Sequence, residues 1–454
     1  MKLFKMAALI FVICFMTTGC DISSDSPENL LNDDIVYSES KNKLYTFVNQ
    51  SLDGTTLLLP ENSSEVGEIN ELGSNIIAFQ KKQDVNDNSS KVGFILISKD
   101  KDNFKLKDNI LLDGKDIEYA NFYDLNNDGN DEVVLLINTE KGTTMYVYSV
   151  VDSEIELISK VQPTWLDNYL NYTNTKIKIG FFDDDLKLDI LMMNIDNKNN
   201  TMFATILNLD NDNKVKKSNA IEFKDVNSSK DLYIVSGKVF NNKKGIILSI
   251  PTNKDNMYIT QIITFKNNKI TVAFNEDNMI KNSYYVPIRD MDLDGVLEIP
   301  VLNNTMIDSF VGTSASIPTT SALVNWKKWN NKEDNDAGTI FISQVYYNYK
   351  NNFRFFIPNT LANKLYIKKN VIGDATYYTF NYYEKDDKQP VEIFQIGISP
   401  KNLVEDAKAT PKLETILAET ENNYYQLIVN DKEVFEKYNL TVDNIKEYFS
   451  LIYK

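Results

Sequence analysis

The chain has 454 residues, with 48 lysine and arginine residues against 64 aspartate and glutamate residues, which gives a formal net charge of −16. This acidic balance disfavours nucleic-acid binding, because capture of a phosphate backbone depends on clustered cations. Histidine is absent and there are only two cysteines, so histidine-dependent catalytic triads and the usual zinc sites are excluded. Any enzyme activity would have to rely on carboxylates, lysine, tyrosine or a bound hard cation.

The first 19 residues have the layout of an export signal. Two lysines precede an apolar run over residues 6–16, which is too short to span a bilayer, and small residues then lead to Cys20. The tripeptide Thr18-Gly19-Cys20 resembles the bacterial lipobox, although Thr17 stands where that motif usually has leucine. The resemblance implies that residues 1–19 are removed and that Cys20 carries a lipid such as palmitate. It places the protein on the outer face of the cytoplasmic membrane, with plain secretion or a short membrane anchor as the alternatives.

The segment 20–42 is polar and acidic and has little apolar periodicity, so we expect a flexible tether after the acylated cysteine. From residue 43 the chain changes to short apolar runs between clusters of Asn, Asp, Gly and Lys, which is typical of antiparallel β-structure. We therefore predict that residues 43–358 form the main folded body.

This body contains five repeated units, each with a nine-residue segment followed directly by an apolar strand. The segments start at residues 67, 124, 181, 237 and 290, which are 57, 57, 56 and 53 residues apart. The strand cores are Ile76–Phe79, Val133–Leu136, Ile190–Met193, Ile246–Ser249 and Ile299–Leu302. Each unit continues with a second short run and most add a third, which together with a strand before the segment indicates a four-stranded blade. The chain is thus predicted to be mainly β, a β-propeller of about five or more blades, with a β-sandwich or an open solenoid as alternatives.

Two of the nine-residue segments carry oxygen donors at positions 1, 3, 5 and 9 and glycine at position 6. Alternating donors in a tight loop point to one centre, and Ca²⁺ takes about six to eight oxygen ligands in flexible geometry. A third segment keeps donors at positions 3, 5 and 9 but has leucine in place of glycine, which predicts a weaker site. The predicted ligands are Asp124, Asn126, Asp128 and Glu132 in the first loop, Asp290, Asp292, Asp294 and Glu298 in the second, and Asp183, Asp185 and Asp189 in the weak third.

This loop pattern resembles the FG-GAP or VCBS-type repeat of integrin α-subunit-like propellers and many bacterial surface proteins. An EF-hand is excluded, because the twelfth position, where that motif needs glutamate, is Leu135 or Val301. The resemblance implies calcium-binding hairpins within the blades, with an ion that braces the hairpin. A solvated turn without a metal is the alternative for each loop, since Asp, Asn and Gly favour turns for local reasons.

Residues 359–454 are predicted to form a small α+β domain, in which residues 441–452 have a helical apolar stripe. Together these features predict a membrane-anchored, extracytoplasmic lipoprotein that is not an enzyme and acts as a binding or assembly module with structural calcium. Its partner would be a protein or polysaccharide of the cell envelope, and not a nucleic acid. The alternative is an extracytoplasmic carbohydrate-active enzyme that uses a pair of carboxylates.

Overall fold

The computed structural model describes residues 39–51, 55–58, 69–72, 75–83, 89–100, 103–140, 142–152, 154–162, 172–210, 213–307, 321–333, 337–383, 390–402 and 415–453. The expected signal peptide, Cys20 and most of the expected tether lie outside these residues. None of the helices in the described ranges is long and apolar enough to cross a membrane.

The fold is mainly β, as predicted, and five antiparallel sheets follow one another along the chain. Sheet 1 contains β1 (Thr55–Leu57), β2 (Ile69–Leu72), β3 (Asn75–Gln83), β4 (Ser90–Asp100) and β5 (Asn103–Asp113). Sheet 2 contains β6 (Asp116–Tyr123), β7 (Glu132–Thr139), β8 (Gly142–Val151) and β9 (Glu154–Val161). Sheet 3 contains β10 (Tyr172–Gly180), β11 (Asp189–Asp196), β12 (Thr201–Leu209), β13 (Val215–Lys217) and β14 (Ile221–Lys224).

Sheet 4 contains β15 (Tyr233–Phe240), β16 (Lys243–Pro251), β17 (Tyr258–Lys266), β18 (Lys269–Val272) and β19 (Ile280–Asn282). Sheet 5 contains β20 (Ile299–Leu302), β21 (Ser321–Trp329), β22 (Thr339–Asn348), β23 (Phe353–Ile357) and β29 (Phe449–Leu451). Two 3-10 helices, η2 (Lys254–Asn256) and η3 (Asn304–Met306), lie in loops of these sheets. The five repeated strand cores fall on β3, β7, β11, β16 and β20, one in each sheet, so the predicted repeat is confirmed.

The apolar runs of the repeat are continuous because both faces of each inner sheet are covered. On β7, Val133 and Leu135 pack against sheet 1, whereas Val134 and Leu136 pack against sheet 3. Successive side chains of a strand point to opposite faces, so a strand between two cores must be apolar at every position. This is face-to-face blade packing, in which each sheet buries its faces on its neighbours.

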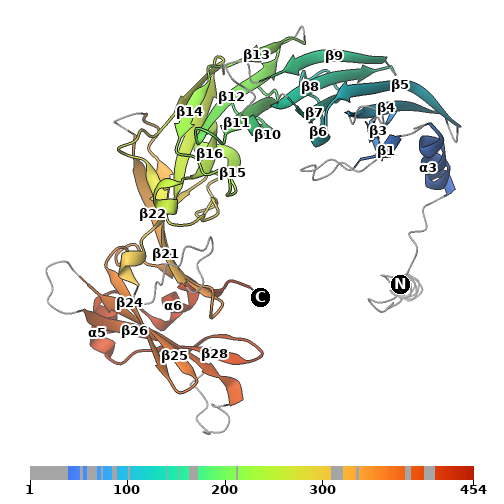
Figure 1. Ribbon diagram of the computed structural model, residues 1–454. Helices are drawn as coiled ribbons and strands as arrows, with labels where there is room; N and C mark the ends of the chain where they lie inside the picture. Colours follow the sequence, from blue (N-terminus) through green and yellow to red (C-terminus); the bar gives the residue numbers. More distant parts are fainter. Residues whose placement is uncertain are drawn as a thin grey trace, which may run out of the picture.

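Figure 1 shows the sheets along an open arc, and no strand within the described ranges pairs sheet 1 with sheet 5. Helix α3 (Glu39–Ser51) covers the outer face of sheet 1, where Leu44 and Val48 pack with Ile76 and Ile95. The C-terminal domain covers sheet 5 at the other end of the row. Because both end faces are covered, the row of blades has no exposed apolar face that would require ring closure. The sequence did not predict α3, which begins inside the expected tether.

The C-terminal domain is α+β, as predicted, and shares a core with sheet 5. Its sheet contains, in spatial order, β24 (Leu365–Ile372), β25 (Ala375–Tyr382), β26 (Val391–Pro400), β28 (Asn423–Ile428) and β27 (Ile416–Glu419), and its helices are α5 (Lys432–Lys437) and α6 (Val442–Tyr448). Helix α6 starts at a capping box between Thr441 and Asn444. The helix is shorter than the predicted stripe, because the chain then enters β29, which pairs with β23 of sheet 5.

Candidate cation-binding loops

Three of the nine-residue segments form loops with one common scaffold: loop 1 (residues 124–132), loop 2 (residues 181–189) and loop 3 (residues 290–298). In each loop the carboxylate at position 9 is fully buried and accepts the backbone N–H of position 2. The donor to acceptor distance is 2.9 Å from Leu125 N to Glu132 Oε2 and 3.2 Å from Phe182 N to Asp189 Oδ2. This bond closes the loop at its base.

The tips of loops 1 and 3 turn on glycine. Gly129 and Gly295 have φ of 90° and 84°, and their N–H groups donate to the first aspartate of each loop, Asp124 and Asp290, at 3.0 and 2.8 Å. In loop 2, Leu186 occupies the glycine position with φ of 64°, a conformation that is strained for a side chain with a Cβ. Loop 2 therefore keeps the scaffold at the expense of backbone strain.

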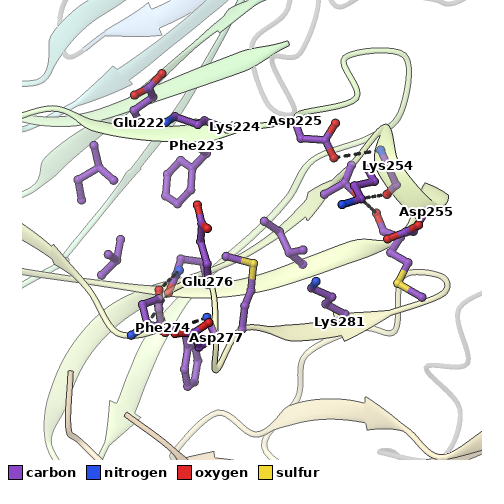
Figure 2. A pocket seen from close by; sticks show the side chains of 18 residues that line it. Glu222, Phe223, Lys224, Asp225, Lys254, Asp255, Phe274, Glu276, Asp277 and Lys281 are labelled. Atoms are coloured by element: carbon purple, nitrogen blue, oxygen red, sulfur yellow. Dashed lines mark hydrogen bonds between the residues drawn. The ribbon is translucent and has the colours of Figure 1, made fainter. Parts of the chain in front are cut away.

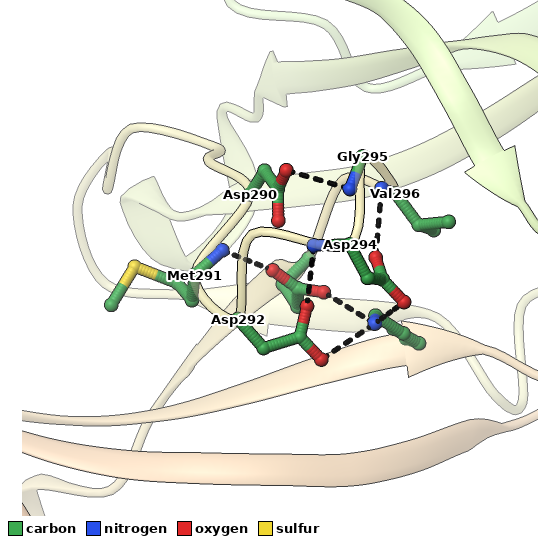
Figure 3. A network of polar contacts seen from close by, with 8 residues as sticks. Asp290, Met291, Asp292, Asp294, Gly295 and Val296 are labelled. Carbon is green, nitrogen blue, oxygen red and sulfur yellow. Dashed lines mark hydrogen bonds and ion pairs between the residues drawn. The ribbon is translucent and has the colours of Figure 1, made fainter.

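Loop 3 brings all four predicted carboxylates together. Asp290, Asp292, Asp294 and Glu298 each offer an oxygen, and these four atoms lie within 4.8 Å of one another. The sequence therefore identified a cluster that could hold a metal ion, as Figure 3 shows. Asp290 Oδ1 is buried and has no hydrogen-bond donor among the described residues.

A residue that the sequence analysis missed, Lys328 of β21, enters this cluster. Its Nζ lies 2.7 Å from Asp292 Oδ2, 2.5 Å from Asp294 Oδ2 and 3.2 Å from Glu298 Oε1, and only 13% of its side chain is exposed. The register of β20 and β21 pairs Ile299 with Lys327, so the next residue lies opposite Glu298. Aligning position 9 of each loop with the residue opposite it on the neighbouring strand would have identified this lysine.

The ammonium group and the carboxylates shift one another's protonation. Burial alone would lower the pKa of Lys328, but its bonds to Asp292, Asp294 and Glu298 raise that pKa above its usual value. The bond from Lys328 lowers the pKa of Asp294, whereas burial raises the pKa of Glu298. Loop 3 is thus held together by a positive charge supplied by the chain itself.

Loop 1 has no lysine in this place. The Asn126 amide Nδ2 instead donates to Asp128 Oδ2 at 2.9 Å and to Glu132 Oε1 at 3.4 Å. Burial raises the pKa of Glu132 to about 7, the Leu125 N–H opposes this shift, and the charges of Asp128 and Asp124 add to it. The carboxylates of loop 1 are therefore held by a neutral amide, which leaves their charge uncompensated.

The three aspartates of the weak site in loop 2 do not form a metal-binding group like that of loop 3, although all three are described. Asp183 Oδ1 accepts the Asp185 N–H at 3.0 Å, and Asp185 Oδ1 accepts the Lys187 N–H at 2.8 Å. Burial, followed by the charge of Asp183, raises the pKa of Asp189 to about 7, while the hydrogen bond from the Phe182 N–H opposes the shift. Loop 2 has one ligand fewer than the other loops, since Phe181 replaces the first aspartate.

The first and fourth repeat units, which lack donors, form hairpins in place of loops. In unit 4, β15 ends at Phe240 and β16 begins at Lys243, so that two asparagines make the whole connection. In unit 1, β2 ends at Leu72 and β3 begins at Asn75. The nine-residue loop is therefore present only where position 9 has a carboxylate to close it.

A separate cavity of about 660 Å³ lies between β14 and β17–β19 (Figure 2). Phe223, Phe274 and several aliphatic side chains line it, together with five acidic residues and three lysines. In Figure 2, Glu276 points from the turn after β18 towards Phe223. Because both signs of charge share its walls, this cavity has no strong preference for an anion or a cation.

No family model and no curated protein matches the chain. Among solved structures, the chain is similar to the β-propeller domain of the Trilobed protease from Pyrococcus furiosus, with 10% identity, 76% of this chain and 90% of that chain covered, and a TM-score of 0.27. It is also similar to the exotype rhamnogalacturonan lyase YesX, with 10% identity, 75% and 68% covered and a TM-score of 0.31. It is similar as well to the polysaccharide lyase Uly1, with 8% identity, 83% of this chain and 91% of that chain covered, and a TM-score of 0.28. Similarities this weak carry no functional argument for the chain.

Proposed function

We propose that the chain is an extracytoplasmic, lipid-anchored binding or assembly module, without enzyme activity, whose blades are braced by calcium at loops 1 and 3. The observation that carries the calcium assignment is the convergence of four carboxylate oxygens within 4.8 Å in loop 3. Carboxylates are the ligands that hard divalent cations prefer. The resemblance of the loops to FG-GAP or VCBS-type repeats supports the same assignment.

The donor set of loop 3 fits Ca²⁺. The buried Asp290 Oδ1, which lacks a donor within the described residues, is one oxygen that an ion could satisfy. Asp292, Asp294 and Glu298 already bind a cation, the ammonium of Lys328, so they would exchange this charge for the ion. A bound ion would supply charge neutralisation to the loop, and the chain's own residues would bind and orient it.

Calorimetric titration of Ca²⁺ into the purified chain tests this proposal. We expect binding at loops 1 and 3, with loss of one site in Asp124→Asn/Glu132→Gln and loss of the other in Asp290→Asn/Glu298→Gln. Asp113→Asn is the matched control, because Asp113 is 95% exposed on the strand β5 and lies outside the loops. Absence of calcium binding by the folded chain, or unchanged binding by both double variants, would disprove the metal assignment.

We favour a binding role over hydrolysis by a carboxylate pair because of where the shifted carboxyl groups lie. A carboxylate-pair hydrolase needs one protonated acid and a second carboxylate facing the same substrate. Among the described residues, the carboxyl groups whose pKa is raised are Glu132, Asp183, Asp189 and Glu298. All four belong to the three loops, and the three at position 9 are tied to backbone N–H groups. These carboxyl groups therefore have a structural explanation.

A further inference from the structure

The chain contains only two arginines, and both line one cavity of about 610 Å³ between sheets 4 and 5. This cavity, the tyrosine–arginine pocket, is also lined by six tyrosines and a tryptophan. None of its lining residues in the described chain is acidic, although the chain has 64 acidic residues. The volume lies in the usual range for small-ligand sites, about 300–1,000 Å³. The charged residues that line the pocket are therefore both positive, although the net charge of the protein is negative.

The two arginines reach the same pocket from different elements. Arg289 follows β19, and Arg354 lies on β23, where its Nε donates to Ser450 Oγ at 2.8 Å. Burial raises the pKa of Tyr347, and the charges of Arg354 and Arg289 both oppose that shift. Within the described residues, every ion pair is made by a lysine, so neither arginine is neutralised by a carboxylate. Both therefore remain available to an anionic ligand.

The aromatic side chains supply flat apolar surfaces next to these charges. Tyr233 and Tyr285 stack with ring centroids 3.5 Å apart, and Tyr347 and Tyr349 stack with centroids 5.9 Å apart. The buried indole Nε1 of Trp326 lies beside the Tyr347 hydroxyl, but has no acceptor at full hydrogen-bond geometry among the described residues. Tyr453, 68% exposed, stands at the rim. Ring faces, hydroxyl groups and a free indole N–H together match a ligand that has both flat faces and many polar groups.

We propose that the tyrosine–arginine pocket binds a sugar that carries a carboxylate, such as a uronic acid unit of an acidic polysaccharide. Arginine forks match a planar carboxylate with two parallel hydrogen bonds, and aromatic rings match the apolar face of a sugar ring. A peptide with a free C-terminus is a poorer fit, because such carboxylates are usually captured by backbone N–H groups. This inference names a ligand for the binding role proposed above, and rests on that role.

The pocket is also linked to loop 3. Arg289 directly precedes Asp290, and its carbonyl oxygen accepts the Glu298 N–H at 2.8 Å. This bond joins the two ends of loop 3 at Arg289, which carries one of the two guanidinium groups. The loop holds the backbone of Arg289 in place, and the side chain extends to the pocket.

Titration of a short galacturonate oligomer into the purified chain, followed by calorimetry, tests the pocket. We expect binding that is at least tenfold tighter than that of the matching neutral galactose oligomer. Arg289→Gln and Arg354→Gln should each weaken it roughly tenfold to hundredfold, since each loses a charge-assisted hydrogen bond. Tyr453→Ser should weaken it while leaving the melting temperature unchanged, because the side chain is exposed. Lys350→Gln, an exposed cation next to Tyr349 that does not line the pocket, is the matched control.

Three results would overturn the inference: no binding of the galacturonate oligomer by the folded chain, equal binding of the neutral oligomer, or unchanged binding by both arginine variants. Tighter binding of a peptide with a free C-terminal carboxylate would likewise reject the saccharide. The same titrations repeated in a chelator separate the two proposals. Saccharide binding without any calcium binding would keep the pocket and reject the metal assignment, and calcium binding without saccharide binding would do the reverse.

Discussion

Replacing Lys328 with methionine should destabilise the calcium-free protein by about 3 kcal/mol. Methionine keeps most of the apolar stem but removes the ammonium, which lies 2.5–3.2 Å from three carboxylates. Breaking a buried ion pair typically costs about 3–5 kcal/mol, because the remaining charge is left buried. Glu298 is fully buried, but Asp292 and Asp294 are 38% and 50% exposed and contribute little. The lower end of the range is therefore appropriate.

Thermal unfolding in a chelator measures this loss. With an entropy of unfolding of about 2.1 cal/mol/K per residue, a chain of 454 residues that unfolds as one unit shifts by about 1 °C per kcal/mol, which predicts a fall in Tm of roughly 3 °C for Lys328→Met. The control is Lys91→Met, whose partner Asp113 is 3.9 Å away and whose side chain is 53% exposed, so its Tm should hardly change. Calcium should then restore the variant, and its affinity at loop 3 should rise tenfold or more, since the competing cation is gone. An unchanged Tm in chelator, or a calcium affinity equal to that of the unaltered chain, would refute the idea that Lys328 stands in for the ion.

Three further predictions concern other parts of the chain. Chemical denaturation of Gly129→Ala should show a free energy of unfolding lower by about 1 kcal/mol, because φ is 90°. The loss is limited to backbone strain, since the added Cβ has open space around it. Gly129→Asn should lose less stability, because asparagine tolerates positive φ better. In chelator, the free energy of unfolding should fall as the pH rises from roughly 4 to about 7. Burial raises the folded-state pKa of Glu132 and Asp189, so the folded state holds more protons than the unfolded chain over this range. Melting curves of Glu132→Gln/Asp189→Asn should show a smaller dependence on pH. Cys20→Ser should abolish incorporation of labelled palmitate and release the protein from membranes, and retained label would contradict the lipobox interpretation.

The repeat could be predicted because each unit places its apolar strand at the same distance from its nine-residue segment. Both faces of β7 and β11 are buried, so their apolar runs are unbroken and align without gaps. The covering of the two ends could not be predicted in this way. Helix α3 contains the polar residues Lys43 and Asn49 and only a narrow apolar stripe, and its packing on sheet 1 depends on a tertiary contact outside the repeat. Periodicity describes the inner blades and says nothing about what covers the outer ones.

The ligand positions in the loops could be predicted because local spacing determines them. Asp290 and Gly295 are five residues apart, and the bond between them lies within one turn. Lys328 and the two arginines could not be predicted from spacing. Lys328 is 30 positions after Glu298 and reaches it only through the register of β20 and β21. Arg289 and Arg354 line the same cavity although they are 65 positions apart in the sequence, which no local pattern encodes.

The difference between loops 1 and 3 follows from charge. Loop 1 has three ligand carboxylates and an amide at position 3, Asn126, whereas loop 3 has a fourth carboxylate there, Asp292, together with Lys328. Four negative charges and one positive charge leave loop 3 with a net charge of −3, the same as the three ligand carboxylates of loop 1. The double variant Asp292→Asn/Lys328→Met gives loop 3 the donor set of loop 1, and it should recover part of the stability that Lys328→Met loses in chelator, because an amide at position 3 can donate to the buried Glu298 as Asn126 donates to Glu132. A double-mutant cycle from melting curves gives this coupling directly, and additive losses would show that the lysine is not there to balance the fourth carboxylate.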